Sequence, residues 1–355
     1  MRLFLVGGFL GSGKTTAIVK ACQHLMKDHR VAVITNDQGD QQVDHAYVNS
    51  FGIPCDEVAN GCFCCNYDDL DKHINSLIKK FHPDIIFAEA VGSCTDLVAT
   101  IAKPFMLTKP GASVVISVFT DATLFLAFFE GRANFISENV QYIYKKQLEE
   151  ADILIINKAD LLSPSQADTI NEHLKKEFPG KKVLYQSSFE EDGIQNWINV
   201  MLEFHPVERR SLEIDYDTYG DGEAQLAWLD ESMTIVSPQQ NAVVIAKDII
   251  AHIDHDIKEK QLTIGHLKFF IETADWKKKI SISTTLPISF YKPEENDTKQ
   301  AHLLINARVQ TEPSVLQEIV TDTLKQIVKK YDCNITVEKW SAFKPGFPKP
   351  THRIA

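Results

Sequence analysis

The stretch Gly8-Phe9-Leu10-Gly11-Ser12-Gly13-Lys14-Thr15 decides the fold, because its glycines and its Lys-Thr pair have the spacing of a phosphate-binding loop. An apolar run at Arg2–Val6 precedes it, and a run with helical periodicity follows at Lys14–Met26. The three segments together predict a strand, a glycine-rich turn and a helix. A glycine-rich turn without a ligand would not require the Lys-Thr pair.

The chemistry of this loop suits a nucleoside triphosphate. Glycines let successive backbone N–H groups turn toward the phosphates, and the helix N-terminus adds its partial positive charge. We expect Lys14 to reach the β- and γ-phosphates and to act in catalysis, and the hydroxyl of Thr15 to bind Mg²⁺. The predicted nucleotide-binding residues of the loop are Gly8, Gly11, Ser12, Gly13, Lys14, Thr15 and Thr16.

Residues 1–206 alternate short apolar runs with longer helical patterns, which is typical of βαβ units and a mainly parallel sheet. The predicted strands are Arg2–Val6, Val31–Thr35, Asp84–Glu89, Ser113–Phe119, Asp152–Ile156 and Lys182–Gln186. The predicted helices are Lys14–Met26, Tyr67–Phe81, Asp121–Phe129, Glu138–Glu149 and Ser165–Glu177. The fold class is therefore α/β, a P-loop NTPase domain whose ligands bind beyond the carboxyl ends of the strands.

The pattern changes after this first domain. Residues 207–223 lose periodicity and are predicted to be a linker, and residues 344–355 form a Pro-rich tail that we expect to be solvated. Residues 224–343 predict a smaller α+β domain with two helices on an antiparallel sheet. Its predicted strands are Ala224–Val236, Ile264–Thr273, Lys278–Thr285, His302–Gln310 and Asn334–Trp340, and its predicted helices are Asn241–Lys260 and Pro313–Tyr331.

The quartet Asn157-Lys158-Ala159-Asp160 follows an apolar strand and indicates the base. A carboxylate at Asp160 can accept hydrogen bonds from both N1 and N2 of guanine, whereas adenine offers no such pair of donors. We therefore expect GTP to be preferred, with Asn157, Lys158 and Asp160 as binding residues. Ser187 follows the next strand, where it either contacts the base or forms a serine turn.

Two more loops are expected near the γ-phosphate. Glu89 ends a strand and Gly92 follows it, which suits a carboxylate that contacts Mg²⁺ through water and a glycine N–H that meets the phosphate. The segment Asn36–Asp40 follows another strand and is the natural first switch loop. Asp37 in it either acts in catalysis, by touching Mg²⁺ or orienting the attacking water, or belongs to a plain turn.

Cys62-Phe63-Cys64-Cys65 places three thiols within four residues, after a glycine that eases a sharp turn. Three thiolates suit zinc or another thiophilic divalent ion and leave one tetrahedral position open. Buried apolar cysteines or a redox pair are the alternatives. The cysteines of the motif are the predicted ligands, and Cys22, Cys94 and Cys333 are expected to be dispensable.

The amino-acid composition excludes some classes of binding partner. The chain has 37 basic and 48 acidic residues, and a formal net charge of -11 argues against nucleic acid or an anionic membrane surface as a partner. No apolar run approaches the roughly 20 residues that a membrane-spanning helix needs. Seven cysteines in this arrangement suit a reducing compartment, so we expect a cytoplasmic protein.

Several separate segments resemble the CobW-like metallochaperone GTPases, kin of the GTPases that assist nickel insertion into urease and hydrogenase. The resemblance covers roughly the first 200 residues. Asp37 and Gln38 depart from the family's Asn-Glu-Phe-Gly-Glu switch. The segments that carry it are Gly7 to Thr16, Asn36 to Asp40, Glu57 through Cys65, Glu89–Gly92 and Asn157–Asp160.

This resemblance implies a GTPase that binds zinc or cobalt at the cysteine motif and delivers it to a client metalloprotein or metal-cofactor enzyme. The sequence leaves open whether the chain forms a homodimer. Two other functions remain to be separated from this one: a GTPase that remodels a corrinoid- or metal-dependent enzyme, and a non-enzymatic metal sensor with bound GTP. His252 and His255 hint at a second metal site, but a solvated helix face explains them better.

Overall fold

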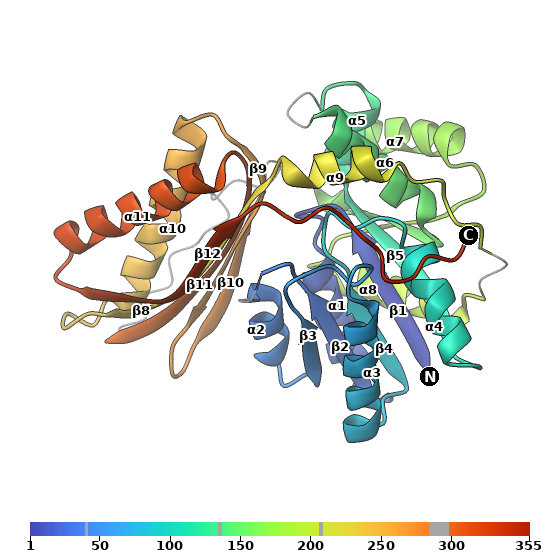
Figure 1. Cartoon of the computed structure of the whole chain (residues 1–355), viewed down its shortest axis with the longest axis horizontal. Coiled ribbons are helices and arrows are strands. Elements are labelled where there is room, and N and C mark those ends of the chain that lie inside the picture. Colours follow the sequence, from blue (N-terminus) through green and yellow to red (C-terminus); the bar gives the residue numbers. More distant parts are fainter. Residues whose placement is uncertain (40–41, 134–136, 206–208, 284–297) are drawn as a thin grey trace. The chain divides into compact units, whose positions relative to one another are not determined.

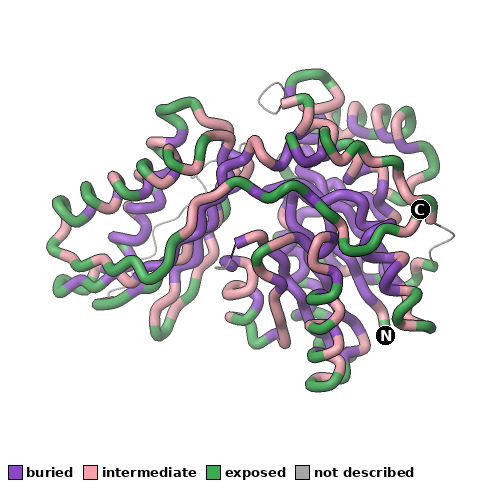
Figure 2. Tube along the Cα trace, in the orientation of Figure 1, coloured by how far each residue is buried: buried purple, intermediate pink, exposed green. Residues whose placement is uncertain are grey.

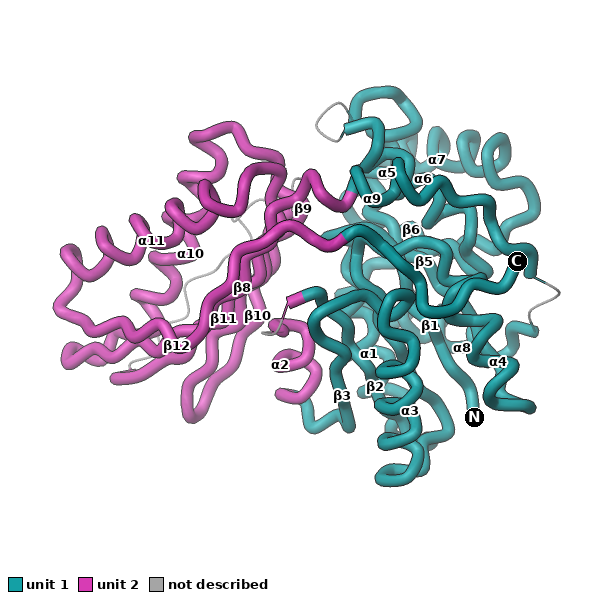
Figure 3. Tube along the Cα trace, in the orientation of Figure 1, with its two compact units in different colours: residues 1–38, 51–222, 347–355 teal, residues 39–50, 223–346 magenta. Residues whose placement is uncertain are grey.

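The computed structural model describes residues 1–39, 42–133, 137–205, 209–283 and 298–355 (Figure 1). It consists of two compact units (Figure 3). Unit 1 comprises Met1–Gln38, Phe51–Gly222 and Phe347–Ala355, and unit 2 comprises Gly39–Ser50 and Glu223–Gly346. None of the described helices is long and apolar enough to cross a membrane.

Unit 1 contains a seven-stranded sheet in which every neighbouring pair of strands is parallel. In spatial order the strands are β3 (Cys55–Val58), β2 (Val31–Asn36), β4 (Ile85–Glu89), β1 (Arg2–Gly8), β5 (Ser113–Asp121), β6 (Ile153–Asn157) and β7 (Lys182–Gln186). The central strands are buried along nearly their whole length (Figure 2). Continuous apolar runs without alternation are what a parallel sheet covered on both faces requires.

The helices of unit 1 confirm the predicted α/β, P-loop class and add elements to it. Those expected from the sequence are α1 (Lys14–Leu25), α3 (Tyr67–Phe81), α5 (Ala122–Phe129), α6 (Glu138–Glu150) and α7 (Pro164–Glu177). The additional helices are α4 (Lys103–Thr108), α8 (Glu191–Glu203) and α9 (Tyr216–Ala224). Helix α9 occupies the end of the stretch expected to be a linker.

Unit 2 confirms the smaller domain with two helices on an antiparallel sheet. The strands, in spatial order, are β10 (Lys277–Ile282), β9 (Thr263–Glu272), β11 (Gln300–Gln310), β8 (Ala227–Val236) and β12 (Asn334–Phe343). Helices α10 (Ala242–Glu259) and α11 (Pro313–Lys330) share one apolar core with this sheet. The end of the predicted strand Lys278–Thr285, residues 284–285, lies outside the described residues.

The opposite face of this second sheet is polar and meets a short helix, α2 (Val43–Asn49). Side chains alternate along a strand, so Ile305 and Ala307 join the apolar core while Asn306 points the other way. The backbone N–H of Val43 donates to Asn306 Oδ1 at 2.8 Å. Helix α2 therefore belongs to unit 2, although it follows the predicted switch loop in sequence.

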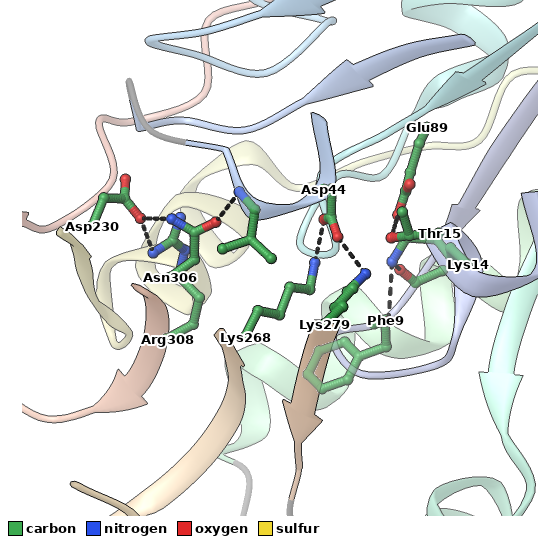
Figure 4. A network of polar contacts seen from close by, with 12 residues as sticks. Phe9, Lys14, Thr15, Asp44, Glu89, Asp230, Lys268, Lys279, Asn306 and Arg308 are labelled. Carbon is green, nitrogen blue, oxygen red and sulfur yellow. Dashed lines mark hydrogen bonds and ion pairs between the residues drawn. The ribbon is translucent and has the colours of Figure 1, made fainter. Parts of the chain in front are cut away.

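Asp44 of α2 secures the helix by two ion pairs (Figure 4). Lys268 and Lys279 both reach its carboxylate, Lys279 at 2.6 Å. Burial alone would raise the pKa of Asp44, but the two ammonium groups hold that pKa well below its ordinary value. Asp44 is therefore ionised at neutral pH.

The compact units divide the chain differently from the domains expected at 1–206, 207–223, 224–343 and 344–355. Residues 39–50 group with the second sheet, and residues 347–355 group with the first. Both segments are held by contacts with residues far away in sequence, which a local pattern does not reveal. Residues 206–208, at the expected linker boundary, lie outside the described residues.

A buried ion pair in unit 2 yields the first prediction. Arg308 and Asp230 are both fully buried and pair at 2.7 Å (Figure 4). The guanidinium group lies over the ring of Trp228. Asp230→Ala should cost about 3–5 kcal/mol of unfolding free energy, because it leaves the Arg308 charge buried without its carboxylate. Urea denaturation measures this cost.

The matched control for Asp230→Ala is Asp322→Ala, which removes an exposed carboxylate from a pair with Lys325. Surface pairs contribute roughly 0–1 kcal/mol, so this variant should unfold close to wild type. Equal losses in the two variants would contradict the assigned role of the buried pair.

Candidate nucleotide and metal site

The phosphate loop joins β1 to α1, and its lysine is already positioned over the loop. Lys14 is buried, and its Nζ donates to the backbone oxygens of Gly8 at 2.7 Å and Phe9 at 3.2 Å (Figure 4). These carbonyl groups hold the ammonium group above the turn. A phosphate bound in the loop would meet this cation together with the N-terminus of α1.

Two glycines of the loop have backbone conformations and close contacts that exclude other residues. Gly8 has φ 123°, and a Cβ there would lie 2.0 Å from the backbone oxygen of Phe119. Gly13 has φ 91°, and a Cβ there would lie 2.3 Å from the side-chain nitrogen of Asn157. The remaining predicted loop residues, Gly11, Ser12 and Thr16, lie on the same turn and the start of α1.

The predicted magnesium ligands are in contact. Thr15 Oγ1 donates to Glu89 Oε1 at 2.9 Å, and both side chains are buried (Figure 4). Strands β1 and β4 are adjacent, so their carboxyl ends bring these residues together. Gly92 follows on the same side, and a Cβ there would lie 2.5 Å from a methyl carbon of Leu10. The loop after Glu89 therefore packs directly on the phosphate loop.

The base-recognition quartet is tied to the same turn. Asn157 Nδ2 donates to the backbone oxygen of Ser12 at 2.7 Å, and Ser188 Oγ donates to Asn157 Oδ1 at 3.0 Å. Lys158 is buried and pairs with Asp121 at 2.6 Å. Asp160 is exposed in a short 3₁₀ turn, where its carboxylate is accessible to a base.

Ser187 has a structural role in this geometry. It is buried, and its Oγ accepts a hydrogen bond from the backbone N–H of Phe189 at 3.3 Å. This contact is the serine turn that the sequence left as an alternative. Its contact with a base stays a prediction.

The first switch segment leads toward the cysteine motif. Asn36 Nδ2 donates to the backbone oxygen of Gly61 at 2.7 Å, and Asn36 Oδ1 accepts from the N–H of Phe63 at 2.8 Å. Asp37 is buried at the end of β2, and its N–H donates to the backbone oxygen of Val58 at 3.3 Å. Asp40 lies outside the described residues. One asparagine side chain thus holds the turn that carries the thiols.

The three thiols of the motif converge. The Sγ atoms of Cys62, Cys64 and Cys65 all lie within 4.8 Å of one another. The turn closes because the N–H groups of Cys65 and Asn66 both donate to the backbone oxygen of Cys62, at 3.1 and 3.0 Å. Gly61, with φ 153°, begins it. Three convergent sulfur donors fit a thiophilic divalent ion.

A fourth cysteine, Cys94, lies beside this cluster, although the sequence predicts that it is dispensable for metal binding. Cys94 is fully buried, and its thiol is hydrogen-bonded to that of Cys64. Hydrogen bonds from Cys62 first, then from Cys65 and Cys94, together with burial, raise the pKa of the Cys64 thiol well above its ordinary value. Cys94 lies two residues after Gly92, a spacing that matches no metal motif and therefore gave no signal.

A second group of metal-ligand types among the described residues is His255, Asp256 and Glu259 of α10. His255 and Glu259 are exposed. The side chain of the neighbouring His252 instead lies near Asp248 of its own helix, with Nδ1 2.8 Å from the Asp248 backbone oxygen. This group has the character of a solvated helix face, as expected from the sequence.

The family model of the CobW/HypB/UreG nucleotide-binding domain matches residues 2–185, which contain the phosphate loop, the cysteine motif, the loop after Glu89 and the base-recognition quartet. The chain belongs to this family. The matched segment ends before Glu223, where the larger part of unit 2, Glu223–Gly346, begins. The family assignment therefore rests mainly on unit 1.

Curated proteins are also similar in sequence to this chain over about half of its length. Zinc chaperone YeiR of Escherichia coli (strain K12) is 25% identical over 194 residues, which are 54% of this chain and 57% of the relative. Zinc-regulated GTPase metalloprotein activator 1 of Dictyostelium discoideum is 25% identical over 215 residues, covering 51% of this chain and 44% of the relative. The chain thus spans about half the length of the curated relatives it matches.

Among solved structures, the chain is similar to HypB from Helicobacter pylori in complex with nickel. The sequence identity is 18% and the TM-score 0.42, and the match covers 57% of this chain and 85% of that chain. HypB from Archaeoglobus fulgidus gives 20% identity and a TM-score of 0.40, with 57% and 89% covered.

Proposed function

We propose that this chain is a GTP-binding and GTP-hydrolysing metallochaperone. It binds zinc or cobalt as cargo at Cys62, Cys64 and Cys65 and delivers the ion to a client metalloprotein or metal-cofactor enzyme. Thr15 and Glu89 would hold the Mg²⁺ that accompanies the nucleotide, Glu89 through water, and the ion would neutralise charge on the phosphates. A zinc cargo is supported by the names of the relatives, which include zinc chaperones.

Hydrolysis of GTP is supported by the way the nucleotide loops meet. Thr15 hydrogen-bonds to Glu89 at the carboxyl ends of two adjacent strands, and Lys14 is held over the same loop by the carbonyl oxygen of Gly8. Phosphoryl transfer needs positioning and electrostatic stabilisation more than covalent chemistry, so a fixed cation and a metal site are its main requirements. Asp37 is buried at the end of β2 and is the candidate to position the attacking water.

The observation that carries the metallochaperone proposal is the Asn36 side chain, which bonds to the backbone on both sides of Cys62. It accepts from Phe63 N–H and donates to Gly61 O. Asn36 opens the switch segment, so a γ-phosphate that orders this segment would also set the turn that carries the thiols. Hydrolysis would then loosen the thiolates and release the ion.

Two other functions make different predictions. A GTPase that remodels a metalloenzyme, with structural cysteines, would hydrolyse GTP without any change in bound metal. A sensor that holds GTP as a structural ligand would show no steady turnover. The convergence of the thiols beside the switch segment favours metal transfer over both.

The experiment that tests the proposal measures metal content as a function of nucleotide state. Purified protein is loaded with one equivalent of zinc, and the free zinc is followed by a colorimetric chelator with GTP, GDP and a non-hydrolysable GTP analogue. We expect GTP turnover to release zinc and the analogue to retain it. Turnover without zinc release would favour the remodelling function, and absence of turnover would favour the sensor.

Base specificity provides a prediction of its own. Asp160→Asn should lower the affinity for GTP on the order of 100-fold, because an amide cannot accept both guanine donors. The same variant should gain affinity for xanthosine triphosphate, whose ring carries a carbonyl at C2 that accepts from the amide. Fluorescent-nucleotide competition measures both constants. An unchanged preference for GTP would contradict the assignment of Asp160.

A further inference from the structure

Residues 347–355, expected to be a solvated tail, lie against the cysteine motif. Thr351 N–H donates to the backbone oxygen of Cys64 at 2.9 Å, and Thr351 Oγ1 donates to the backbone oxygen of Cys65 at 2.7 Å. The N–H of Lys349 donates to the sulfur of Cys65 at 3.1 Å. Two consecutive ligand residues are thus held by a segment more than 280 positions away in sequence.

The same segment is anchored beyond the motif at three further points. The ring of His352 lies edge-on to Tyr67, with centroids 5.2 Å apart. Arg353 Nε donates to Asp96 at 2.8 Å, and this buried carboxylate also accepts from Tyr216 at 2.7 Å. Ile354 N–H donates to the backbone oxygen of Ala99 at 2.9 Å. The segment therefore has a defined course over unit 1.

The position of the segment relative to the sulfurs matters. Cys62 and Cys64 are buried, whereas Cys65 is only partly buried and is the most exposed cysteine of the motif. The Lys349 N–H reaches this sulfur. Lys349 stands between Pro348 and Pro350, whose rings restrict the backbone of the segment, so less entropy is lost when its amide is held at the sulfur.

We propose that Lys349 and Thr351 are positioning residues of the metal site. The inference rests on the proposed metal binding at Cys62, Cys64 and Cys65. An N–H donor to sulfur stabilises the thiolate that binds the ion, and two hydrogen bonds to the carbonyls of Cys64 and Cys65 fix the backbone that carries the ligands. Partners of this kind set ligand orientation and typically change metal affinity 10- to 100-fold.

One variant removes the N–H group of Lys349, and a control variant changes only the lysine side chain. Lys349→Pro eliminates the donor to Cys65, and Lys349→Ala keeps the backbone amide but shortens the side chain. Cobalt affinity is measured in the full chain by sulfur-to-cobalt charge-transfer absorption and by chelator competition. We expect Lys349→Pro to bind cobalt about 10-fold more weakly and Lys349→Ala to bind it as wild type does.

A second pair of variants addresses the hydroxyl group. Thr351→Val removes the donor to the Cys65 carbonyl with little change of volume, and Thr351→Ser restores it. We expect a loss of cobalt affinity in the valine variant and recovery in the serine variant. The melting temperature of the metal-free protein serves as the control, because a merely structural role would lower it without altering the charge-transfer band.

The outcomes separate this inference from the proposed function. Wild-type protein that binds no cobalt through sulfur would overturn the metallochaperone proposal itself. Wild-type protein that binds cobalt, with Lys349→Pro and Thr351→Val equal to it, would overturn the positioning role alone. Equal weakening in Lys349→Pro and Lys349→Ala would assign the effect to the lysine side chain and also overturn the role of the amide.

Discussion

Lys14→Ala should lower the turnover number for GTP hydrolysis by about 1000-fold, the largest catalytic effect expected of any single change in this chain. In the structure, Lys14 Nζ is held over the phosphate loop by the carbonyl oxygens of Gly8 and Phe9. Bound GTP would replace these acceptors with its β- and γ-phosphate oxygens. Negative charge shifts along this bridge in the transition state, so loss of the cation raises the barrier directly.

The measurement for Lys14→Ala is steady-state release of phosphate at saturating GTP, with nucleotide affinity determined separately. Lys20→Ala is the matched control, because Lys20 lies on the same helix and is exposed. It should turn over GTP at the wild-type rate. Turnover by Lys14→Ala within a few-fold of wild type would refute the assignment of the phosphate loop.

The strand and helix that flank the phosphate loop were predicted correctly, because the pattern that indicates them is local. Gly13 and Lys14 must be neighbours for one turn to present both N–H groups and an ammonium group to a phosphate, and such spacing is visible in eight residues. Helix α3 was likewise predicted at its observed bounds, Tyr67–Phe81, because its apolar face recurs at helical spacing. Neither feature depends on distant contacts.

Elements stabilised by distant residues were missed for a physical reason. Helix α2 has seven residues and only two buried side chains, Val43 and Val48, so it shows no helical stripe. Its stability comes from Asp44, paired with lysines more than 220 positions away. Strand β3 is equally inconspicuous, since three of its four residues are only partly buried.

The cysteine motif was visible in a local pattern, whereas the residues around it come from distant parts of the sequence. Cys62, Cys64 and Cys65 were predicted as ligands from their spacing alone, and the structure brings their sulfurs together. Cys94 and Thr351 approach the motif from a loop and from a segment without any periodicity. Backbone hydrogen bonds such as that of Thr351 leave no trace in a residue pattern, because any residue other than proline can donate through its N–H.

The largest effect on metal binding is expected from Cys64→Ser, which should weaken the binding of cobalt or zinc at least about 100-fold. Loss of an outer partner alone costs 10- to 100-fold, and loss of a ligand should exceed that. Cys64 is the central thiol of the cluster, since it contacts Cys62 and Cys65 through sulfur. A hydroxyl group is a much harder and weaker ligand for these ions than a thiolate.

Cobalt titration of Cys64→Ser, followed by the sulfur-to-cobalt band in the near ultraviolet, measures this loss directly. Cys333→Ser is the control, because Cys333 belongs to unit 2 and packs at the edge of its apolar core. In wild type, binding should strengthen from about pH 6 to about pH 8, because the ion competes with protons for thiols and the pKa of Cys64 is raised. If Cys64→Ser binds one cobalt ion as tightly as wild type, the ion lies elsewhere and the metallochaperone proposal loses its main support.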